Sequence, residues 1–298
     1  MNAILSRVAV CDLHAGSAVD SAASAGIQCL AAVGIDPADV SVLINVGVYR
    51  ENNIMEPSVA SLIQQKMELN PDPAKNRLDQ RTLSYDLVSG ATGFLNAVLL
   101  ANSLLQTGSA QHVLIVAADV HPSGHRPDAF PFSTLGSAVL LQAGNSTHTG
   151  FGPFMFQTAP AGTAVGYRTQ GAVQDFGTEG RAYADMHLDA DWIDQLETFA
   201  VATGRSFLQK HRIAPEQIDI LVASQLEREF PQRLARQLGL RADCQSVDLY
   251  DQFGDPHTAS PGACVHHLVE QGQLTPGKTV LFVSVGSGLS AACALYRA

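Results

Sequence analysis

The stretch YDLVSGATGFLNAVLLANSLLQ, residues 85–106, carries the strongest structural signal in this chain of 298 residues. It begins inside Leu83–Val88, which has the short apolar pattern of a strand. Its second part, Thr92–Gln106, has nine apolar residues in fifteen and no charged residue. A helix that is apolar on all sides must be buried on all sides. We therefore expect Thr92–Gln106 to form a helix at the centre of the molecule, entered through a tight turn over Ser89–Gly93.

The rest of the chain alternates short apolar runs with longer helical patterns. The runs predict strands at Ile4–Val10, Val40–Val46, Val113–Ala118, Ser137–Gln142, Ile218–Ala223, Val280–Val285 and Ser290–Tyr296. Apolar residues at helical spacing predict helices over Ala18–Val33, from Pro57 onward, and over Asp191–His211, Pro231–Leu238 and Ala259–Gln271. Strands separated by helices of this length favour an α/β fold in which parallel sheets are covered by helices on both faces.

Two segments of the first half recur in the second half in the same order. Gly34–Ile44 matches Arg212–Val222 at an offset of 178 residues, and both combine a helix end, an Ile-x-Pro turn and a buried strand. Val113–Ala118 matches Val280–Val285 at an offset of 167 residues. Because the offsets are similar, the repeat predicts two duplicated halves. We place these halves at residues 1–148 and 149–298.

The composition argues against several classes of protein. The formal charge is −10, charged residues make up 15% of the chain and apolar residues 46%, so we expect neither nucleic acid nor a membrane as a partner. No apolar run approaches the ~20 residues that span a bilayer, and we expect no signal peptide. The five cysteines have no C-x-x-C spacing, which favours buried thiols in a reducing cytoplasm. His121 and His125 lack a third ligand nearby, so no metal site is predicted.

An ordered set of motifs spans most of the chain. The motifs are Ile35–Ile44 (IDPADVSVLI), Glu56–Gln64 (EPSVASLIQ), Tyr85–Phe94, Gly108 leading to Val113, Phe253–Ser260 (FGDPHTAS) and Val285–Leu289 (VGSGL). In this order they resemble the thiolase superfamily, specifically its ketoacyl synthase III branch. The resemblance implies a five-layered α-β-α-β-α fold made of two duplicated halves. It also implies a homodimer, or a heterodimer with a catalytic paralogue, paired through the edge strand of the N-terminal half. An acyl carrier protein or an acyl thioester is the further partner that it implies.

The same resemblance implies a reaction whose residues are substituted in this chain. Members of the family transfer an acyl group from a thioester to a cysteine. They condense it with the enolate of a decarboxylated malonyl thioester, which a histidine and an asparagine stabilise. At the positions that match these three residues the chain has Ala91, Ser224 and Asp255. Alanine cannot carry an acyl group, serine cannot become a cation, and an ionised aspartate would repel the enolate. We therefore expect no decarboxylative condensation.

Two functions stay open at this point. The first is a degenerate, non-condensing subunit of fatty-acid- or polyketide-type acyl metabolism that pairs with a catalytic paralogue. The second is an acyltransferase or thioesterase acting on acyl-coenzyme A or acyl-carrier-protein thioesters. It would use Ser89 or Thr92 as the nucleophile, or a group formed by Ser224, Asp255 and His257. An ordinary condensing enzyme would require a different alignment at all three substituted positions.

No cofactor is predicted, and the residues that would bind one are unknown. The strand Ile4–Val10 leads almost directly into the helix that begins near Ala18. In the family that the chain resembles this interval is longer and helps to receive coenzyme A. We therefore expect a weak or absent coenzyme A site.

Overall fold

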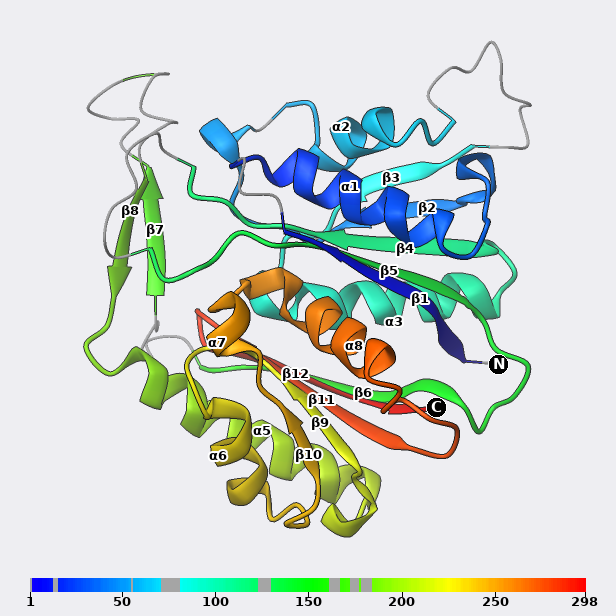
Figure 1. Cartoon of the computed structure of the whole chain (residues 1–298). Coiled ribbons are helices and arrows are strands. Elements are labelled where there is room, and N and C mark those ends of the chain that lie inside the picture. The colour runs from blue at the N-terminus through cyan, green and yellow to red at the C-terminus, as the bar shows by residue number, and fades with distance from the viewer. Residues whose placement is uncertain are drawn as a thin grey trace.

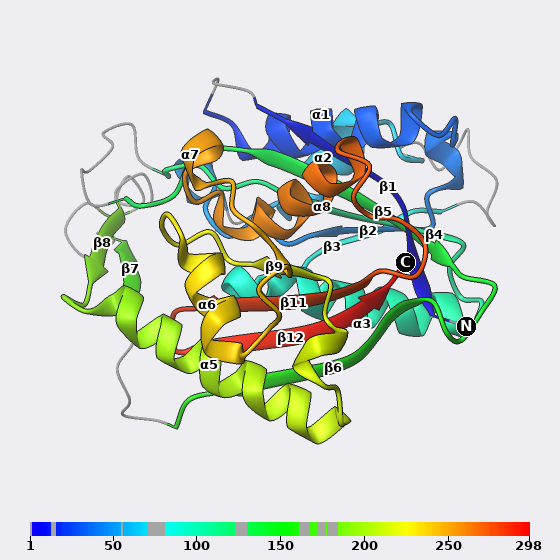
Figure 2. The same cartoon turned by 60° about the horizontal axis from the view of Figure 1, so that its bottom comes forward.

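Two sheets alternate with layers of helices in the folded chain (Figure 1). The computed structural model describes residues 2–12, 16–54, 56–70, 81–122, 130–160, 167–171, 177 and 184–298. Helices α1 and α2 cover the outer face of the first sheet, α3 and α8 lie between the sheets, and α5 and α6 cover the outer face of the second. Figure 2 shows α5 and α6 lying across the second sheet. This arrangement confirms the predicted five-layered α/β fold.

The two sheets have the same strand order. The first sheet runs β1-β5-β4-β2-β3 and the second β6-β12-β11-β9-β10, so each strand of one half has a counterpart in the other. The first sheet consists of β1 Ala3–Cys11, β2 Val42–Asn45, β3 Leu83–Asp86, β4 His112–Ala117 and β5 Gly136–Ala143. The second consists of β6 Gly150–Thr158, β9 Ile220–Ala223, β10 Gln245–Val247, β11 Thr279–Gly286 and β12 Ser290–Arg297. The chain passes from the first sheet to the second between β5 and β6.

The helices follow the same duplication. They are α1 Ala18–Ala31, α2 Val59–Lys66, α3 Gly93–Gln106, α5 Trp192–His211, α6 Phe230–Leu238, α7 Tyr250–Phe253 and α8 Ser260–Glu270. In each half one long helix joins the first two strands, and α3 and α8 take equivalent places in the central layer. A separate hairpin pairs β7 Tyr167–Gly171 with β8 Ala184–Leu188.

The sheets are mixed, which corrects the prediction of parallel sheets. β2 is parallel to both β3 and β4, but β5 is antiparallel to β4 and to β1. In the second sheet, β12 is antiparallel to β11 and to β6. Only the segment Ser287–Leu289 joins β11 to β12. Because a parallel connection needs a crossover of a dozen or more residues, β12 has to run back beside β11.

Helix α3 lies between the sheets as predicted, but one side of it is exposed. Val98 is completely buried, and the Phe94 ring lies 6.3 Å from the ring of Phe282 in the second sheet. Leu99 and Leu100, by contrast, are 38% and 37% exposed. The prediction of burial on every side is therefore wrong for the single chain. Among the described residues, none covers these two neighbouring side chains fully.

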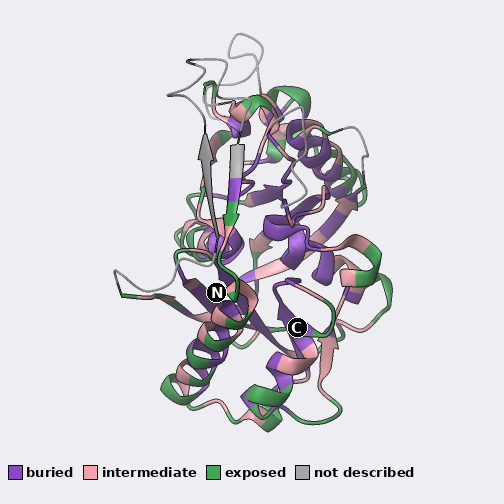
Figure 3. Cartoon of the chain, turned by 90° about the vertical axis from the view of Figure 1, so that its left-hand side faces the viewer, coloured by how far each residue is buried: buried purple, intermediate pink, exposed green. Residues whose placement is uncertain are grey.

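Burial elsewhere follows the layers: the strands are mostly buried and the outer helix faces are exposed (Figure 3). The edge of the first sheet departs from this pattern. In β3, Leu83 is 59% exposed, and Val88, just beyond the strand, is 52% exposed. The corresponding strand of the second sheet, β10, has only three residues. Across the described ranges we find no helix with the length and apolarity that a bilayer crossing requires, and the cytoplasmic location stays a prediction.

Candidate functional site

The turn into α3 contains the position that the resemblance assigns to a nucleophile. Gly90–Thr92 form a short 3-10 helix, η3, in which Gly90 has a φ of 54°, a conformation that glycine adopts without strain. Ala91 is buried. The hydroxyls of Ser89 and Thr92 lie 3.1 Å apart, and Thr92 Oγ1 donates to the Ser89 carbonyl over 2.8 Å. Asn96 Nδ2 donates to Ser89 Oγ over 3.3 Å. None of these partners is a base that could activate a hydroxyl.

The second position, Ser224, lies directly after β9 and is buried. Its hydroxyl donates to the carbonyl of Val285 over 3.3 Å and accepts from the Val285 N–H over 3.0 Å. The neighbouring Gln225 is also buried, and its amide donates to the carbonyls of Ala223 and Val247 over 3.0 Å each. Both side chains therefore tie strands of the second sheet together. A hydroxyl bound in this way is a structural link between β9 and β11.

The third position, Asp255, lies between α7 and a short 3-10 helix, η6, formed by His257–Ala259. Its carboxylate accepts from the His257 N–H over 2.8 Å and from Ser260 Oγ over 3.4 Å. Its own backbone carbonyl accepts from the N–H of Ser133 in the first half over 2.8 Å. Asp255 is buried, so its carboxylate holds the start of η6 and α8 out of water while its backbone carbonyl joins the two halves.

A second carboxylate, Asp119, lies just beyond β4 and is completely buried. One of its oxygens accepts from the N–H groups of Val48 and Tyr49 over 2.8 and 2.7 Å. The other binds His257 Nδ1 and the Thr258 N–H, each over 3.1 Å, as well as the Thr258 hydroxyl. Asp119 therefore connects a loop of the first half to η6 of the second. We call Asp119, Asp255 and His257 the central junction.

Burial and charge shift the pKa values of the central junction in opposite directions. Burial raises the pKa of Asp255 to about 6, although the charge of His257 opposes this. Burial also raises the pKa of Asp119, but the charge of His257 and the hydrogen bonds outweigh it and keep this pKa below its ordinary value. Burial lowers the pKa of His257, and the charge of Asp119 outweighs that, so the pKa is raised. The junction thus holds an ion pair beside a weakly acidic carboxyl.

Aromatic rings pack against the central junction. The His257 ring is stacked on Phe132, with centroids 4.2 Å apart, and Tyr49 lies 5.4 Å from Phe132 in a second stacked pair. Phe130 meets the edges of both Tyr49 and Phe132 at 5.3 Å. The rings keep the ion pair in an apolar environment, where its attraction is stronger than in water.

The elements that carry the three substituted positions converge, but the predicted group of Ser224, Asp255 and His257 is not a hydrogen-bonded triad. η3 contacts both β11 and η6, so Ala91 lies in the same region as the other two positions. The His257 ring, however, binds Asp119, and Ser224 binds the backbone of Val285. The structure brings the predicted residues together without the contacts that nucleophilic catalysis needs.

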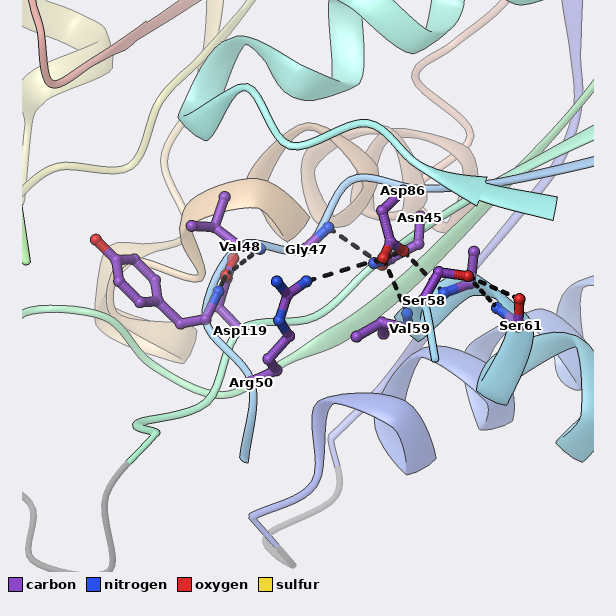
Figure 4. A network of polar contacts seen from close by, with 11 residues as sticks. Asn45, Gly47, Val48, Arg50, Ser58, Val59, Ser61, Asp86 and Asp119 are labelled. Atoms are coloured by element: carbon purple, nitrogen blue, oxygen red, sulfur yellow. Dashed lines mark hydrogen bonds and ion pairs between the residues drawn. The ribbon is translucent and has the colours of Figure 1, made fainter. Parts of the chain in front are cut away.

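A further polar network lies at the carboxyl ends of β2 and β3 (Figure 4). Asp86 accepts from Asn45 Nδ2 over 2.9 Å and from the N–H groups of Val59 and Ala60, at the start of α2, over 2.9 and 2.8 Å. It caps a helix, because those N–H groups have no partner inside α2. Arg50 points toward this carboxylate, with Nη1 3.9 Å from Asp86 Oδ2.

Asp119 and Arg50 belong to these networks but are not among the candidate residues predicted from the sequence. Asp119 directly follows a predicted buried strand, and an acidic side chain at the end of such a strand is a signal that could have been used. Arg50 lies in a loop and carries no sequence signal beyond its charge. The clusters of His, Cys, Asp and Glu that a metal ion would need are not found within the described ranges.

The amino-acid sequence is similar to those of known β-ketoacyl-[acyl-carrier-protein] synthases. Residues 208–298 match the family described as 3-oxoacyl-[acyl-carrier-protein (ACP)] synthase III C terminal. The chain is 25% identical over 241 residues to β-ketoacyl-[acyl-carrier-protein] synthase III of Mycobacteroides abscessus, which covers 72% of this chain and 64% of that protein. It is 23% identical over 243 residues to a synthase III of Mycobacterium marinum, with 73% and 66% covered. The chain thus spans slightly less than two thirds of the length of these relatives.

Solved structures have the same fold. The 3-oxoacyl-(acyl carrier protein) synthase III, FabH, of Pseudomonas aeruginosa PAO1 has a TM-score of 0.81 at 18% identity and covers 100% and 98% of the two chains. The tetronic acid condensing enzyme AbyA1 has a TM-score of 0.74 at 20% identity, with 93% and 86% covered. A Xanthomonas campestris OleA variant with bound lauric acid and lauroyl-CoA has a TM-score of 0.75 at 16% identity, with 100% and 99% covered. These likenesses confirm the fold that the motifs predicted.

Proposed function

We propose that this chain, a ketoacyl synthase III-like protein with the thiolase-like fold, is a non-condensing subunit that pairs with a catalytic paralogue in fatty-acid- or polyketide-type metabolism. One observation carries the proposal. The described residues form both sheets and the helical layers around the position of the family's reaction centre, yet that position holds Ala91, Ser224 and Asp255, and both polar side chains have structural hydrogen bonds. A chain that has the fold of a condensing enzyme but not its reactive side chains fits the role of a subunit that supports a catalytic partner.

The chemistry of the three positions supports the loss of condensation. A thiolate is the nucleophile that such a reaction requires, and Ala91 offers only a methyl group. Asp255 is mainly ionised at pH 7, because its pKa of about 6 lies below that pH. A carboxylate can only accept hydrogen bonds and repels the developing negative charge of an enolate. Substitutions of this kind commonly reduce a rate by roughly 10³ to 10⁶.

The hydrogen bonds argue against the second function, an acyltransferase or thioesterase that uses a hydroxyl. Ser89 and Thr92 are bound to each other and to Asn96, and Ser224 is bound to Val285. A catalytic hydroxyl needs a base within hydrogen-bond reach. The histidine nearest to this role, His257, gives its Nδ1 to Asp119.

The edge of the first sheet supports the pairing. An edge strand presents unpaired N–H and C=O groups to which another chain can add. Leu83 and Val88 are more than half exposed along β3, and Leu99 and Leu100 of α3 are more than a third exposed. Exposed apolar side chains of this size, gathered beside an open strand, are typical of an interface with another protein. We infer that β3 and α3 meet the partner subunit, and we call this surface the seam.

The names of the relatives support a role with acyl thioesters. The mycobacterial relatives are β-ketoacyl-[acyl-carrier-protein] synthases III, and the OleA variant holds lauric acid and lauroyl-CoA. An acyl carrier protein or an acyl thioester is therefore the further partner that we expect for the assembled pair. The pair would keep one working reaction centre, in the paralogue.

Co-expression with a paralogue that retains cysteine, histidine and asparagine tests the proposal. Native mass spectrometry should give a one-to-one complex. The chain alone should release no carbon dioxide from malonyl-carrier protein, whereas the complex should be active. Recovery of homodimers only would refute the pairing with a paralogue. An acyl adduct on Ser89, Thr92 or Ser224 after incubation with acyl thioesters would favour the hydroxyl enzyme instead.

A further inference from the structure

Among the described residues, the guanidinium group of Arg50 has one long ion-pair contact, and its Nη1 atom makes no hydrogen bond. Its side chain is 22% exposed, and the closest acidic oxygen, Asp86 Oδ2, is 3.9 Å from Nη1. Nη1 itself is buried and has no hydrogen-bond partner. A buried N–H group without an acceptor costs about 1–3 kcal/mol, and more when it is charged. An acceptor supplied by another chain would remove this cost.

Asp86 cannot supply that acceptor well. Its two oxygens already receive hydrogen bonds from Asn45 Nδ2 and from the N–H groups of Val59 and Ala60. Figure 4 shows that these donors surround the carboxylate from the side of β2 and α2, while Arg50 approaches from its own loop. The separation of 3.9 Å is longer than a hydrogen bond. The Asp86 carboxylate therefore caps the start of α2. The Nη1 atom of Arg50 has no hydrogen-bond acceptor among the described residues.

The loop that carries Arg50 is held in place on both sides. Immediately before it, the N–H groups of Val48 and Tyr49 are bound by Asp119. Immediately after it, the Glu51 carboxylate accepts from Ser17 Oγ over 2.6 Å and from the Ala18 N–H over 2.9 Å, at the start of α1. The backbone at Arg50 is thus anchored to two other elements. A side chain on such a loop is positioned before any partner arrives, which lowers the entropy cost of binding.

The position of Arg50 relates it to the seam. Asp86 is the last residue of β3, the edge strand, and Val88, two residues further on, is 52% exposed. The guanidinium therefore lies beside the end of the strand that meets the partner in the proposed function. We propose that Arg50 binds a carboxylate side chain of the partner subunit across the seam. This inference rests on the proposed pairing, and it names a contact that would fix how the two subunits are oriented.

A carboxylate fits this position for chemical reasons. The guanidinium is planar and always charged, and it presents N–H donors in a fork that matches the two oxygens of a carboxylate. Pairing across the seam would remove the remaining water from Arg50. The partner carboxylate would then satisfy the buried Nη1, which the chain alone leaves without an acceptor.

Substitution of Arg50 tests the contact through the stability of the pair. In sedimentation velocity, Arg50→Gln should raise the dissociation constant at least about tenfold, equal to about 1.4 kcal/mol. Arg50→Lys should give a smaller loss, because it keeps the charge and not the fork. Arg236→Gln, an exposed arginine on α6, is the matched control and should leave the dissociation constant unchanged. Thermal unfolding of each single chain checks that the variants fold. A dissociation constant unaffected by Arg50→Gln would overturn the inference.

A zero-length cross-link identifies the acceptor. In the Arg50→Lys variant, a carbodiimide activates a carboxyl of the partner, the introduced amine forms an amide with it, and the urea derived from the carbodiimide leaves. Peptide mapping should give one dominant amide to an Asp or Glu of the partner. Millimolar malonate serves as a competing probe. If malonate stabilises the wild-type chain but not Arg50→Gln, and pairing is unaffected by the substitution, Arg50 binds a free acid and the inference fails.

The outcomes separate this inference from the function on which it rests. If the wild-type chain forms no pair with a paralogue or with a second copy, the proposed function and the contact fail together. If the pair forms but does not respond to Arg50→Gln, only the contact fails.

Discussion

The central junction and the seam each contain a carboxylate that receives several hydrogen bonds, completely buried at Asp119 and 16% exposed at Asp86, but the two regions differ in how fully their charges are paired. At the junction, Asp119 binds groups from both halves, including His257. At the seam, Asp86 is bound equally well, yet Arg50 has a buried nitrogen without a partner and Leu83 is 59% exposed. Within the described residues the junction has its charges paired, whereas Nη1 of Arg50 at the seam has no hydrogen-bond acceptor.

This difference indicates a division of roles. Groups that find all their partners inside one chain stabilise the fold, since unfolding exposes them together. Groups whose hydrogen-bond partners come from another chain stabilise the complex of the two chains. Variants at the junction should therefore change the free energy of unfolding and leave pairing alone, whereas variants at the seam should do the opposite.

Removal of Asp119 should give the largest effect. Asp119→Ala leaves the charge of His257 buried without its partner, and three backbone N–H groups, of Val48, Tyr49 and Thr258, lose their acceptor. We expect the free energy of unfolding in urea to fall by about 3–5 kcal/mol. Asp119→Asn, which keeps one acceptor oxygen, should lose less and stay folded for the pairing measurement.

Asp248→Ala is the matched control for that experiment. Asp248 also accepts two backbone N–H bonds, from Glu229 and Tyr250, but one of them is exposed to solvent. Its loss should be about 1 kcal/mol. A loss for Asp119→Ala no larger than that of the control would contradict the role given to the junction.

A charge on the seam should weaken pairing next most strongly. Leu83→Lys puts an ammonium group on the open edge of β3, where charged side chains oppose strand addition. We expect the dissociation constant of the pair to rise by roughly a hundredfold, equal to about 2.8 kcal/mol. The free energy of unfolding of the single chain should change by less than about 0.5 kcal/mol. Ile27→Lys, at an exposed apolar position of α1 that is 48% accessible, should leave pairing unchanged. Equal effects of the two substitutions would show that β3 is not the seam.

Neutralising Asp255 should stabilise the chain, by the smallest amount. Its pKa is about 6 in the folded chain against an ordinary value of 3.8. A carboxyl whose pKa is raised on folding stabilises the fold while it is protonated. That contribution is complete below about pH 4 and is lost as the pH rises through about 6. Asp255→Asn, which is neutral throughout, should raise the free energy of unfolding by about 1–3 kcal/mol at pH 7.

The pH dependence checks the sign of this effect. The gain from Asp255→Asn should shrink as the pH falls and disappear near about pH 4, while pairing stays the same. Asp251→Asn, whose side chain is 69% exposed, should give no comparable change. A loss of stability at pH 7 would mean that the Asp255 carboxylate stabilises the junction.

Much of the fold could be predicted from the sequence, because strong local patterns agree with the tertiary structure. The strands and helices that carry the internal repeat lie where apolar periodicity puts them. The pattern fails for β6, where Gly150, Gly152 and Pro153 interrupt the signal of a strand. It also fails for β10, which has only three residues. The direction of β12 follows from its three-residue connection to β11, so the expectation of parallel sheets overlooked a signal that the sequence contains.

The candidate site, like the fold, could be predicted only in part from the sequence. Ala91 and Asp255 could be found because each lies within an ordered motif, and Ser224 because it directly follows a predicted strand. The contact between Asp119 and His257 could not, since 138 residues separate them and only the packing of the two halves brings them together. The unpartnered nitrogen of Arg50 is a property of three-dimensional surroundings, and no spacing in the sequence indicates it.

The duplicated sheets have one further consequence, for the size of the assembly. β1 and β6 contact each other inside the chain, and the edge of the second sheet, β10, offers three residues against the exposed apolar edge at β3. A protein with two adhesive edges could add copies end to end and grow into a filament. If β3 is the single adhesive edge, as the proposed pairing requires, growth should stop when the first partner has added, and the complex should close at two subunits.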